Sequence, residues 1–178
     1  DHDSDTSTPC QNCEAGKIAA EEGRFGSDGC TDCATGQYAA AGSDTCTACP
    51  SGRIDHDSDA ATACQDCTAG KITTAAGQAG NCIDCSAGEY AAAGTTACIP
   101  CVAGTIDNDS SPATECTDCP AGRFTADAGS TGSCTGCSAG TYAAAGTTSC
   151  INCVAGKLDH DGDPATECFT CPAGTYED

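Results

Sequence analysis

The sequence predicts a small disulfide-rich tandem repeat, an elongated rod that is mostly irregular, with short two-stranded β pieces and little or no helix. Two observations lead to this fold class. The chain has 20 cysteines in 178 residues, and every one belongs to a Cys-x-x-Cys pair. Large apolar side chains are few, with no Trp and no Met. One shared core of so few large side chains could not offset roughly 1–2 kcal/mol of backbone entropy per ordered residue.

The cysteine pairs divide residues 1–178 into one continuous array of about ten modules of 16–20 residues. From Cys30 onward, first cysteines are spaced in the cycle 16, 18, 18, which gives a three-module super-repeat of 52 residues. Both ends lie inside a repeat, because Asp1–Asp5 aligns with Asp55–Asp59. We therefore expect this sequence to be an excerpt of a longer chain.

Two positions are the same in all ten modules. Gly stands three residues after the second cysteine of each pair, and a large apolar residue stands two residues further on, as in Cys49, Gly52 and Ile54. We expect the glycine to supply a positive φ or a close backbone approach. We expect the apolar residue to cover the disulfide of its own module.

The loop after the apolar residue comes in three kinds. It is Ala-rich in Tyr38–Gly42, acidic in Asp55–Asp59 and Gly-rich in Ile72–Gly80, and each kind recurs once per super-repeat. The first Gly-rich copy carries two extra residues, and its unusual set is expected to be the most specialised part of the chain: Glu21, Glu22, Arg24 and Phe25. Glycine ends each Ala run at once, so turns and short strand pairs are expected rather than helices.

Disulfides and zinc compete as interpretations of the cysteine pairs. A pair followed after 12 to 16 residues by another resembles a zinc ribbon. A zinc cluster uses two pairs, however, which conflicts with a three-pair period, and each four-thiolate site would add about two negative charges to a chain of net charge −20. Dense cysteine with little core is typical of secreted disulfide scaffolds. Disulfides are favoured, and a zinc-binding array stays as an alternative.

Repeat symmetry suggests how the cysteines pair. A disulfide within one Cys-x-x-Cys pair would leave the loops between pairs without a covalent link. Bonds between the first cysteines of successive pairs would alternate along the array, which conflicts with a period of three pairs. The simple remaining solution joins each second cysteine to the next first one. It gives Cys13–Cys30, Cys33–Cys46, Cys49–Cys64, Cys67–Cys82, Cys85–Cys98, Cys101–Cys116, Cys119–Cys134, Cys137–Cys150 and Cys153–Cys168, and it leaves Cys10 and Cys171 to pair outside this segment.

Several modules resemble a known family. Cys-Ser-Ala-Gly-Glu-Tyr (Cys85–Tyr90), Cys-Pro-Ala-Gly-Arg-Phe (Cys119–Phe124) and Cys-Pro-Ala-Gly-Thr-Tyr (Cys171–Tyr176) resemble the ephrin-receptor-like cysteine-rich repeat. That repeat is similar to the first submodule of tumour-necrosis-factor receptor cysteine-rich domains. The resemblance implies extracellular, elongated, disulfide-laddered modules with the same neighbour-to-neighbour pairing, and it implies no particular ligand.

The acidic loops are candidate calcium sites. Asp-x-Asp-x-Asp places alternating carboxylates on a turn, as at the start of a calcium loop, and Glu115 and Glu167 could add an oxygen. The candidate ligands are Asp55, Asp57, Asp59, Asp107, Asp109, Glu115, Asp159, Asp161, Asp163 and Glu167. A solvated acidic turn without metal is the alternative. Asn108-Asp109-Ser110 is an N-glycosylation sequon on an expected surface loop.

The charge and the motifs exclude several function classes. With 26 acidic and six basic residues, the chain is a poor partner for nucleic acid or an anionic membrane, and no apolar run is long enough to insert into a bilayer. No nucleophile–base pair or phosphate-binding loop is found, so we expect no enzyme.

The sequence favours an extracellular or cell-surface structural segment of a stalk, fibre or filament. Its expected partners are neighbouring copies or other extracellular structural proteins, with covalent glycans. A receptor or adhesion ectodomain that binds a protein ligand is the second hypothesis. The three-module period could align like loops on separate faces, or it could record only the duplication of a three-module block.

Overall fold

The computed structural model describes residues 11–19 and 29–175, and within them the chain forms nine two-stranded antiparallel sheets and no helix. The sparse secondary structure expected from the sequence is confirmed. In chain order the strand pairs are β1 (Lys17–Ile18) with β2 (Thr31–Asp32), β3 (Gln37–Tyr38) with β4 (Thr47–Ala48), β5 (Arg53–Ile54) with β6 (Gln65–Asp66), β7 (Lys71–Ile72) with β8 (Ile83–Asp84), β9 (Glu89–Tyr90) with β10 (Ile99–Pro100), β11 (Thr105–Ile106) with β12 (Thr117–Asp118), β13 (Arg123–Phe124) with β14 (Thr135–Gly136), β15 (Thr141–Tyr142) with β16 (Ile151–Asn152), and β17 (Lys157–Leu158) with β18 (Phe169–Thr170).

Every sheet is built from the same two sequence segments. The first strand is the residue pair that follows the invariant glycine, and the second strand is the x-x of the next Cys-x-x-Cys. In the Cys49–Cys64 module, Arg53 pairs with Asp66 and Ile54 with Gln65. The cysteines that flank the second strand belong to two different disulfides, which limits each sheet to two residues per strand.

The described residues contain nine disulfides, each between the second cysteine of one pair and the first cysteine of the next. They are the bonds that repeat symmetry favours: Cys13–Cys30, Cys33–Cys46, Cys49–Cys64, Cys67–Cys82, Cys85–Cys98, Cys101–Cys116, Cys119–Cys134, Cys137–Cys150 and Cys153–Cys168. Cys10 lies outside the described residues. Cys171 is half-buried and forms no disulfide within them.

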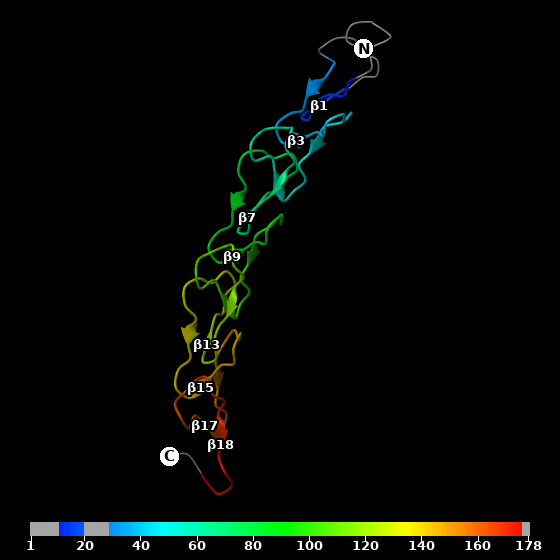
Figure 1. Cartoon of the computed structure of the whole chain (residues 1–178). Helices are drawn as coiled ribbons and strands as arrows, with labels where there is room; N and C mark the ends of the chain where they lie inside the picture. The colour runs from blue at the N-terminus through cyan, green and yellow to red at the C-terminus, as the bar shows by residue number, and fades with distance from the viewer. Residues whose placement is uncertain (1–10, 20–28, 176–178) are drawn as a thin grey trace, which may run out of the picture. The chain divides into compact units, whose positions relative to one another are not determined.

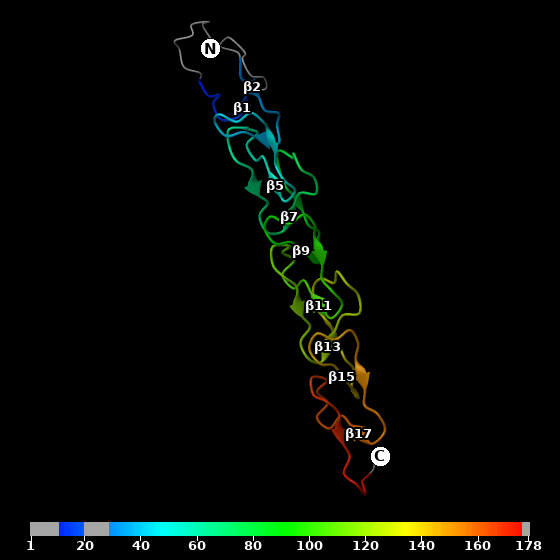
Figure 2. The same cartoon turned by 90° about the vertical axis from the view of Figure 1, so that its right-hand side faces the viewer.

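By its contacts the chain divides into two units, residues 1–84 with 92–97 and residues 85–91 with 98–178. Within the first unit, β1, β3 and β7 follow in chain order (Figure 1). Within the second, β11, β13, β15 and β17 do the same (Figure 2). Each unit is therefore a succession of modules in which sequence neighbours are also neighbours in space.

At Ile106 the apolar residue of a module packs against the disulfide of the next module. Ile106 is 4% exposed and forms a cluster with Cys119 and Cys134, the bonded cysteines of the following module. The expectation that this residue covers its own module's disulfide is wrong at Ile106. The strand that carries it pairs with residues just before Cys119, and this register brings the side chain forward onto the next bond.

Within the described residues, no helix is long and apolar enough to cross a membrane.

Candidate functional sites: the module joints and the acidic turns

Within each unit, the invariant glycine joins a module to the next through its backbone N–H. The acceptor belongs to the residue six positions after the second cysteine of the next module, which we call the joint residue. The joint residues observed are Ala39, Asp55, Thr73, Asp107, Thr125, Ala143 and Asp159. All of them are buried except Asp159, which is half-buried.

The joints differ chemically with the kind of loop. In the Ala-rich modules the acceptor is the backbone oxygen, 2.8 Å from Gly16 N to Ala39 O. In the acidic modules it is a carboxylate oxygen, 2.9 Å from Gly36 N to Asp55 Oδ2. In the Gly-rich modules the threonine accepts with both its hydroxyl and its backbone oxygen, as where Gly104 N lies 2.9 Å from Thr125 Oγ1 and 3.0 Å from Thr125 O. The super-repeat therefore contains three different joints.

The threonine and aspartate joints carry further hydrogen bonds. Gly52 N lies 2.7 Å from the Thr73 hydroxyl oxygen, which in turn lies 3.4 Å from the Arg53 carbonyl oxygen. Asp55 also receives the Gly80 N–H at its own backbone oxygen, 2.9 Å away. Its second carboxylate oxygen, Oδ1, is buried and has no hydrogen-bond partner among the described residues. A bond from a backbone N–H to a carboxylate is stronger than one between neutral groups.

The invariant glycines also contact the loop two modules further on. A Cβ on Gly52, whose φ is +84°, would lie near the carbonyl oxygen of Gly94, far inside van der Waals contact. Gly36 meets Gly77 in the same way, and Gly88 meets Gly129. Both reasons expected for glycine, a positive φ and a close backbone approach, are confirmed at these positions.

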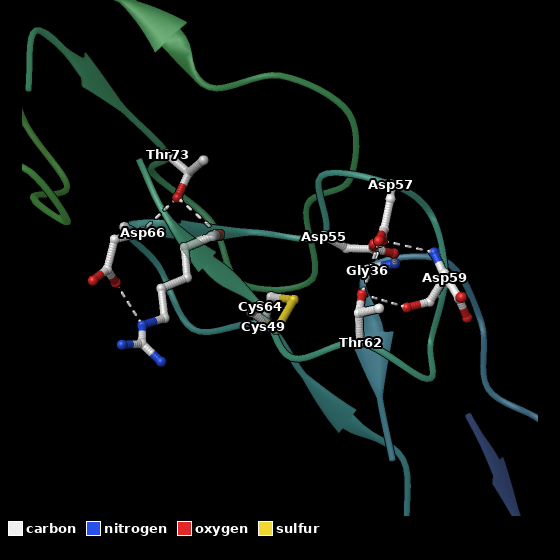
Figure 3. Close-up of a disulfide and its surroundings, with 11 residues drawn as sticks. Gly36, Cys49, Asp55, Asp57, Asp59, Thr62, Cys64, Asp66 and Thr73 are labelled. Atoms are coloured by element: carbon white, nitrogen blue, oxygen red, sulfur yellow. Dashed lines mark hydrogen bonds and ion pairs between the residues drawn. A yellow bond between two sulfur atoms is a disulfide. The ribbon is translucent and has the colours of Figure 1, made fainter. Parts of the chain in front are cut away.

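Each acidic loop is a turn closed by its own carboxylates. Asp57 Oδ1 accepts from the Asp59 backbone N–H at 3.1 Å and from the Thr62 hydroxyl at 2.9 Å (Figure 3). Asp59 Oδ1 accepts from the Ala61 N–H at 2.9 Å. The first aspartate, Asp55, instead faces Gly36 of the preceding module (Figure 3). Asp55 thus bonds the turn to the preceding module, whereas Asp57 and Asp59 close the turn itself.

The middle carboxylate of each turn has a lowered pKa. The Asp59 backbone N–H that donates to Asp57 is the main cause that lowers the pKa of this carboxyl below 3.8, and the Thr62 hydroxyl and nearby His56 add to it. The pKa of Asp109 is lowered by the Ser111 N–H, and that of Asp161 by the Asp163 N–H. Hydrogen bonds to the ionised form favour that form.

The residue after the middle aspartate adopts left-handed backbone geometry. Ser58 has φ +59° and Ser110 has φ +57°, whereas Gly162 stands at the same place in the third turn with φ +66°. A side chain with a Cβ is strained in this region and glycine is not. Two of the three turns therefore hold strain that the third avoids.

The structure does not gather the candidate calcium ligands into one cluster. Among the described residues no group of three or more His, Cys, Asp or Glu side chains is placed to hold a metal ion. The aspartates of each turn bond to backbone and threonine groups, and Glu115 and Glu167 are exposed. Calcium binding stays a prediction without support from this geometry.

Cross-strand ion pairs occupy several of the basic residues. Lys17 lies 3.3 Å from Asp32, Arg53 lies 2.6 Å from Asp66, and Lys71 pairs with Asp84. Each pair joins the residue before the apolar position to the residue before the next second cysteine. Exposed pairs of this kind contribute only about 0–1 kcal/mol each, so they add little to the stability of the modules.

The sequon residue Asn108 is exposed, in the bend that follows buried Asp107. Its position fits an accessible acceptor, and glycosylation there stays a prediction. The unusual set in the first Gly-rich loop, Glu21, Glu22, Arg24 and Phe25, lies outside the described residues.

The disulfide ladder and the repeated strand pairs can be compared with known families. Residues 88–133 match a family model described as tyrosine-protein kinase ephrin type A/B receptor-like. This stretch is similar to an ephrin-receptor-like cysteine-rich repeat. It spans the Cys101–Cys116 module and most of its two neighbours, so the resemblance seen in the sequence is confirmed there. A comparison with curated proteins found no match.

The ephrin-receptor-like repeat and the disulfide density together suggest an extracellular or cell-surface segment. Repeats of this kind are typically not enzymes.

Sequence reasoning missed the joint residues. Their signal was present, because this position is always Ala in Ala-rich modules, Asp in acidic ones and, from Thr73 on, Thr in Gly-rich ones. Without the fold, a residue next to the apolar position looks like the start of a loop. Only the packing of one module on the next shows that it is buried.

Proposed function

We propose that this chain is a structural segment of an extracellular stalk, fibre or surface filament. The observation that carries the proposal is the series of module joints. Within each unit a module is bonded to the next through its invariant glycine and touches the loop of the one after it. Overlapping contacts of this range stiffen an array, because bending at one joint disturbs two neighbouring interfaces.

The disulfides support the same role. Each bond closes a loop with a sequence separation of 13 to 17 residues, so no covalent staple depends on distant parts of the chain. A locally closed loop resists extension and proteolysis even when a neighbour opens. Neighbouring copies and other extracellular structural proteins are the proposed partners.

Small-angle X-ray scattering of the oxidised chain tests the proposal. A compact chain of 178 residues would have a radius of gyration of about 16 Å, and an unfolded one about 45 Å. A stiff array should give a value well above 16 Å with a narrow, uniform cross-section, and the reduced chain is the control without staples. A value near 16 Å would contradict the structural role.

A receptor or adhesion ectodomain is the second candidate, because the description of the matched family model names a receptor. A zinc array is the third, and it needs as thiolates the same cysteines that form disulfides in the structure. Thiol titration of the denatured, unreduced chain separates the zinc array from the two disulfide-bonded candidates. The cysteines of the nine bonds should be unreactive, and reactive thiols in all ten pairs, with zinc released on denaturation, would favour the zinc array.

A further inference from the structure

An exposed apolar groove lies beside the Cys101–Cys116 disulfide. Its volume is about 180 Å³, and Tyr90, Ile99, Val102 and Glu115 are among the residues that line it. The side chains of Ile99 and Val102 are 46% and 64% exposed. Single exposed aliphatics are ordinary, but two beside a tyrosine and a carboxylate form a surface with distinct apolar and charged parts.

The size of the groove limits its occupant. Sites for small molecules and cofactors typically measure about 300–1,000 Å³, which is larger than this groove. A volume of this order suits one large side chain of a partner, held against Ile99 and Val102. The groove is therefore suited to a protein segment, and too small for a cofactor.

The charge of the groove selects among protein segments. Glu115 is exposed at its edge, and no basic side chain lines it. The whole chain has a net charge of −20. An acidic segment would be repelled, whereas a segment with a Lys or Arg next to an apolar side chain is attracted.

The same combination recurs one super-repeat later and is absent one super-repeat earlier. Tyr142, Ile151, Val154 and Glu167 stand 52 residues after the groove residues, and Ile151 and Val154 are 46% and 62% exposed. Lys157 replaces Thr105 there. In the first super-repeat the positions of Ile99, Val102 and Glu115 are taken by Thr47, Pro50 and Ala63. The array itself thus shows which substitutions its modules tolerate.

We propose that the groove formed by Tyr90, Ile99, Val102 and Glu115 binds a segment of a partner protein in which an apolar side chain stands next to a Lys or Arg. The apolar side chain packs on Ile99 and Val102, and the cation pairs with Glu115. The surface at Ile151 and Val154 is a second, weaker site, because Lys157 repels the same cation. This proposal does not depend on the structural role proposed above.

Heteronuclear NMR titration of the full oxidised chain tests it. The probes are three capped hexapeptides: Gly-Ser-Leu-Lys-Ser-Gly, one with Ser in place of Leu, and one with Ser in place of Lys. The first should shift the amide signals of Ile99, Val102 and Glu115 most. The I99T/V102P variant, which copies Thr47 and Pro50, should bind it at least tenfold more weakly. T105K should weaken binding at the groove, and K157T should strengthen binding at the second surface.

Three results would overturn the proposal. Equal binding of the Leu–Lys and Ser–Lys peptides, with shifts spread over the acidic turns, would show attraction by net charge alone. Unchanged binding by I99T/V102P would remove the groove as the site. Sedimentation showing that the chain self-associates without peptide, and that I99T/V102P abolishes this, would assign the groove to a second copy.

Discussion

At the scale of single residues, the invariant glycine meets four requirements that no other residue can combine. In Gly52 the backbone takes a positive φ, the N–H donates to Thr73, and the carbonyl accepts from the Cys67 N–H at 2.9 Å. The space where a side chain would begin is taken by Gly94. Alanine could adopt the backbone angle under strain, but it could not share the space.

Gly52→Ala should therefore lower the free energy of unfolding by about 3 kcal/mol or more, as strain and steric overlap add. Gly129→Ala is the matched control, because Gly129 also has a positive φ but open space around its Cβ position. The control should cost about 1–2 kcal/mol. Thermal denaturation under oxidising conditions, with hydrogen exchange of the Cys67 amide, measures both. Equal losses in the two variants would contradict the close approach.

The strained serines give a prediction of opposite sign. Ser58→Gly should stabilise its turn by about 0.5–1 kcal/mol, since relief of left-handed strain exceeds the entropy that glycine adds to the unfolded chain. Gly162→Ser, at the equivalent place in the third turn, should destabilise by a similar amount. Hydrogen exchange of the turn amides in each variant reports the change. If both variants changed the stability of their turns in the same direction, the backbone angle φ would not be the cause of the change.

At the scale of elements, the sheets are too short to be stable alone. A strand of two residues makes few ladder bonds, and isolated two-stranded sheets are at best marginal in water. Each sheet here is held between two disulfides, and its first strand leads into a joint residue that bonds the preceding module. Each sheet is thus stabilised mainly by the disulfides that flank it and by the hydrogen bond at its joint residue.

The acidic turns should lose their internal hydrogen bonds in acid. The pKa of Asp57 is lowered in the folded chain, so the stabilisation by its carboxylate is complete above the unfolded pKa of about 3.9 and is lost as pH falls through the folded value. Carbon-detected NMR should give a midpoint for Asp57 below 3.8. The Asp59 amide should lose protection in the same range, and Asp57→Asn should remove this pH dependence. A midpoint above 4 would contradict the turn geometry.

At the scale of the whole molecule, the chain folds as a succession of local closures. The hydrogen bonds between modules join residues that lie close together in the sequence. Examples are the bonds from Gly77 N to Cys49 O at 2.7 Å and from Gly94 N to Cys67 O at 2.9 Å. Contacts between modules reach the second neighbour, as where Gly52 meets Gly94. Damage to one module should spread to its two neighbours on either side and no further.

Removal of one disulfide tests this range. Cys119→Ala with Cys134→Ala deletes the bond on which Ile106 packs, and should lower the free energy of unfolding by about 3 kcal/mol, with an added loss for the cavity at Ile106. Limited proteolysis should cut between residues 85 and 168 only, which spans the two modules on either side of the deleted bond. The same change at Cys33 and Cys46, where both cysteines are half-buried, is the control with less apolar packing. Cuts throughout the chain would show longer-range cooperativity.

The cysteine spacing by itself determined the module length, the absence of one shared core and the neighbour-to-neighbour pairing of second and first cysteines. These follow from composition and symmetry, because a chain so poor in large apolar residues can be ordered only by staples, and equivalent repeats favour equivalent bonds. The sequence also indicated the invariant glycine as a special backbone position. It could not indicate what that glycine touches.

Only the tertiary structure decided where the modules meet. The joint residues Asp55 and Thr73 read as loop residues in sequence, yet they are buried acceptors for glycines about 20 residues earlier. Ile106 covers the next disulfide rather than its own, since strand register sets the direction of its side chain. The Tyr90–Val102 groove likewise depends on packing. Cysteine spacing fixes which bonds close, and the contacts between closed loops depend on backbone geometry that spacing does not contain.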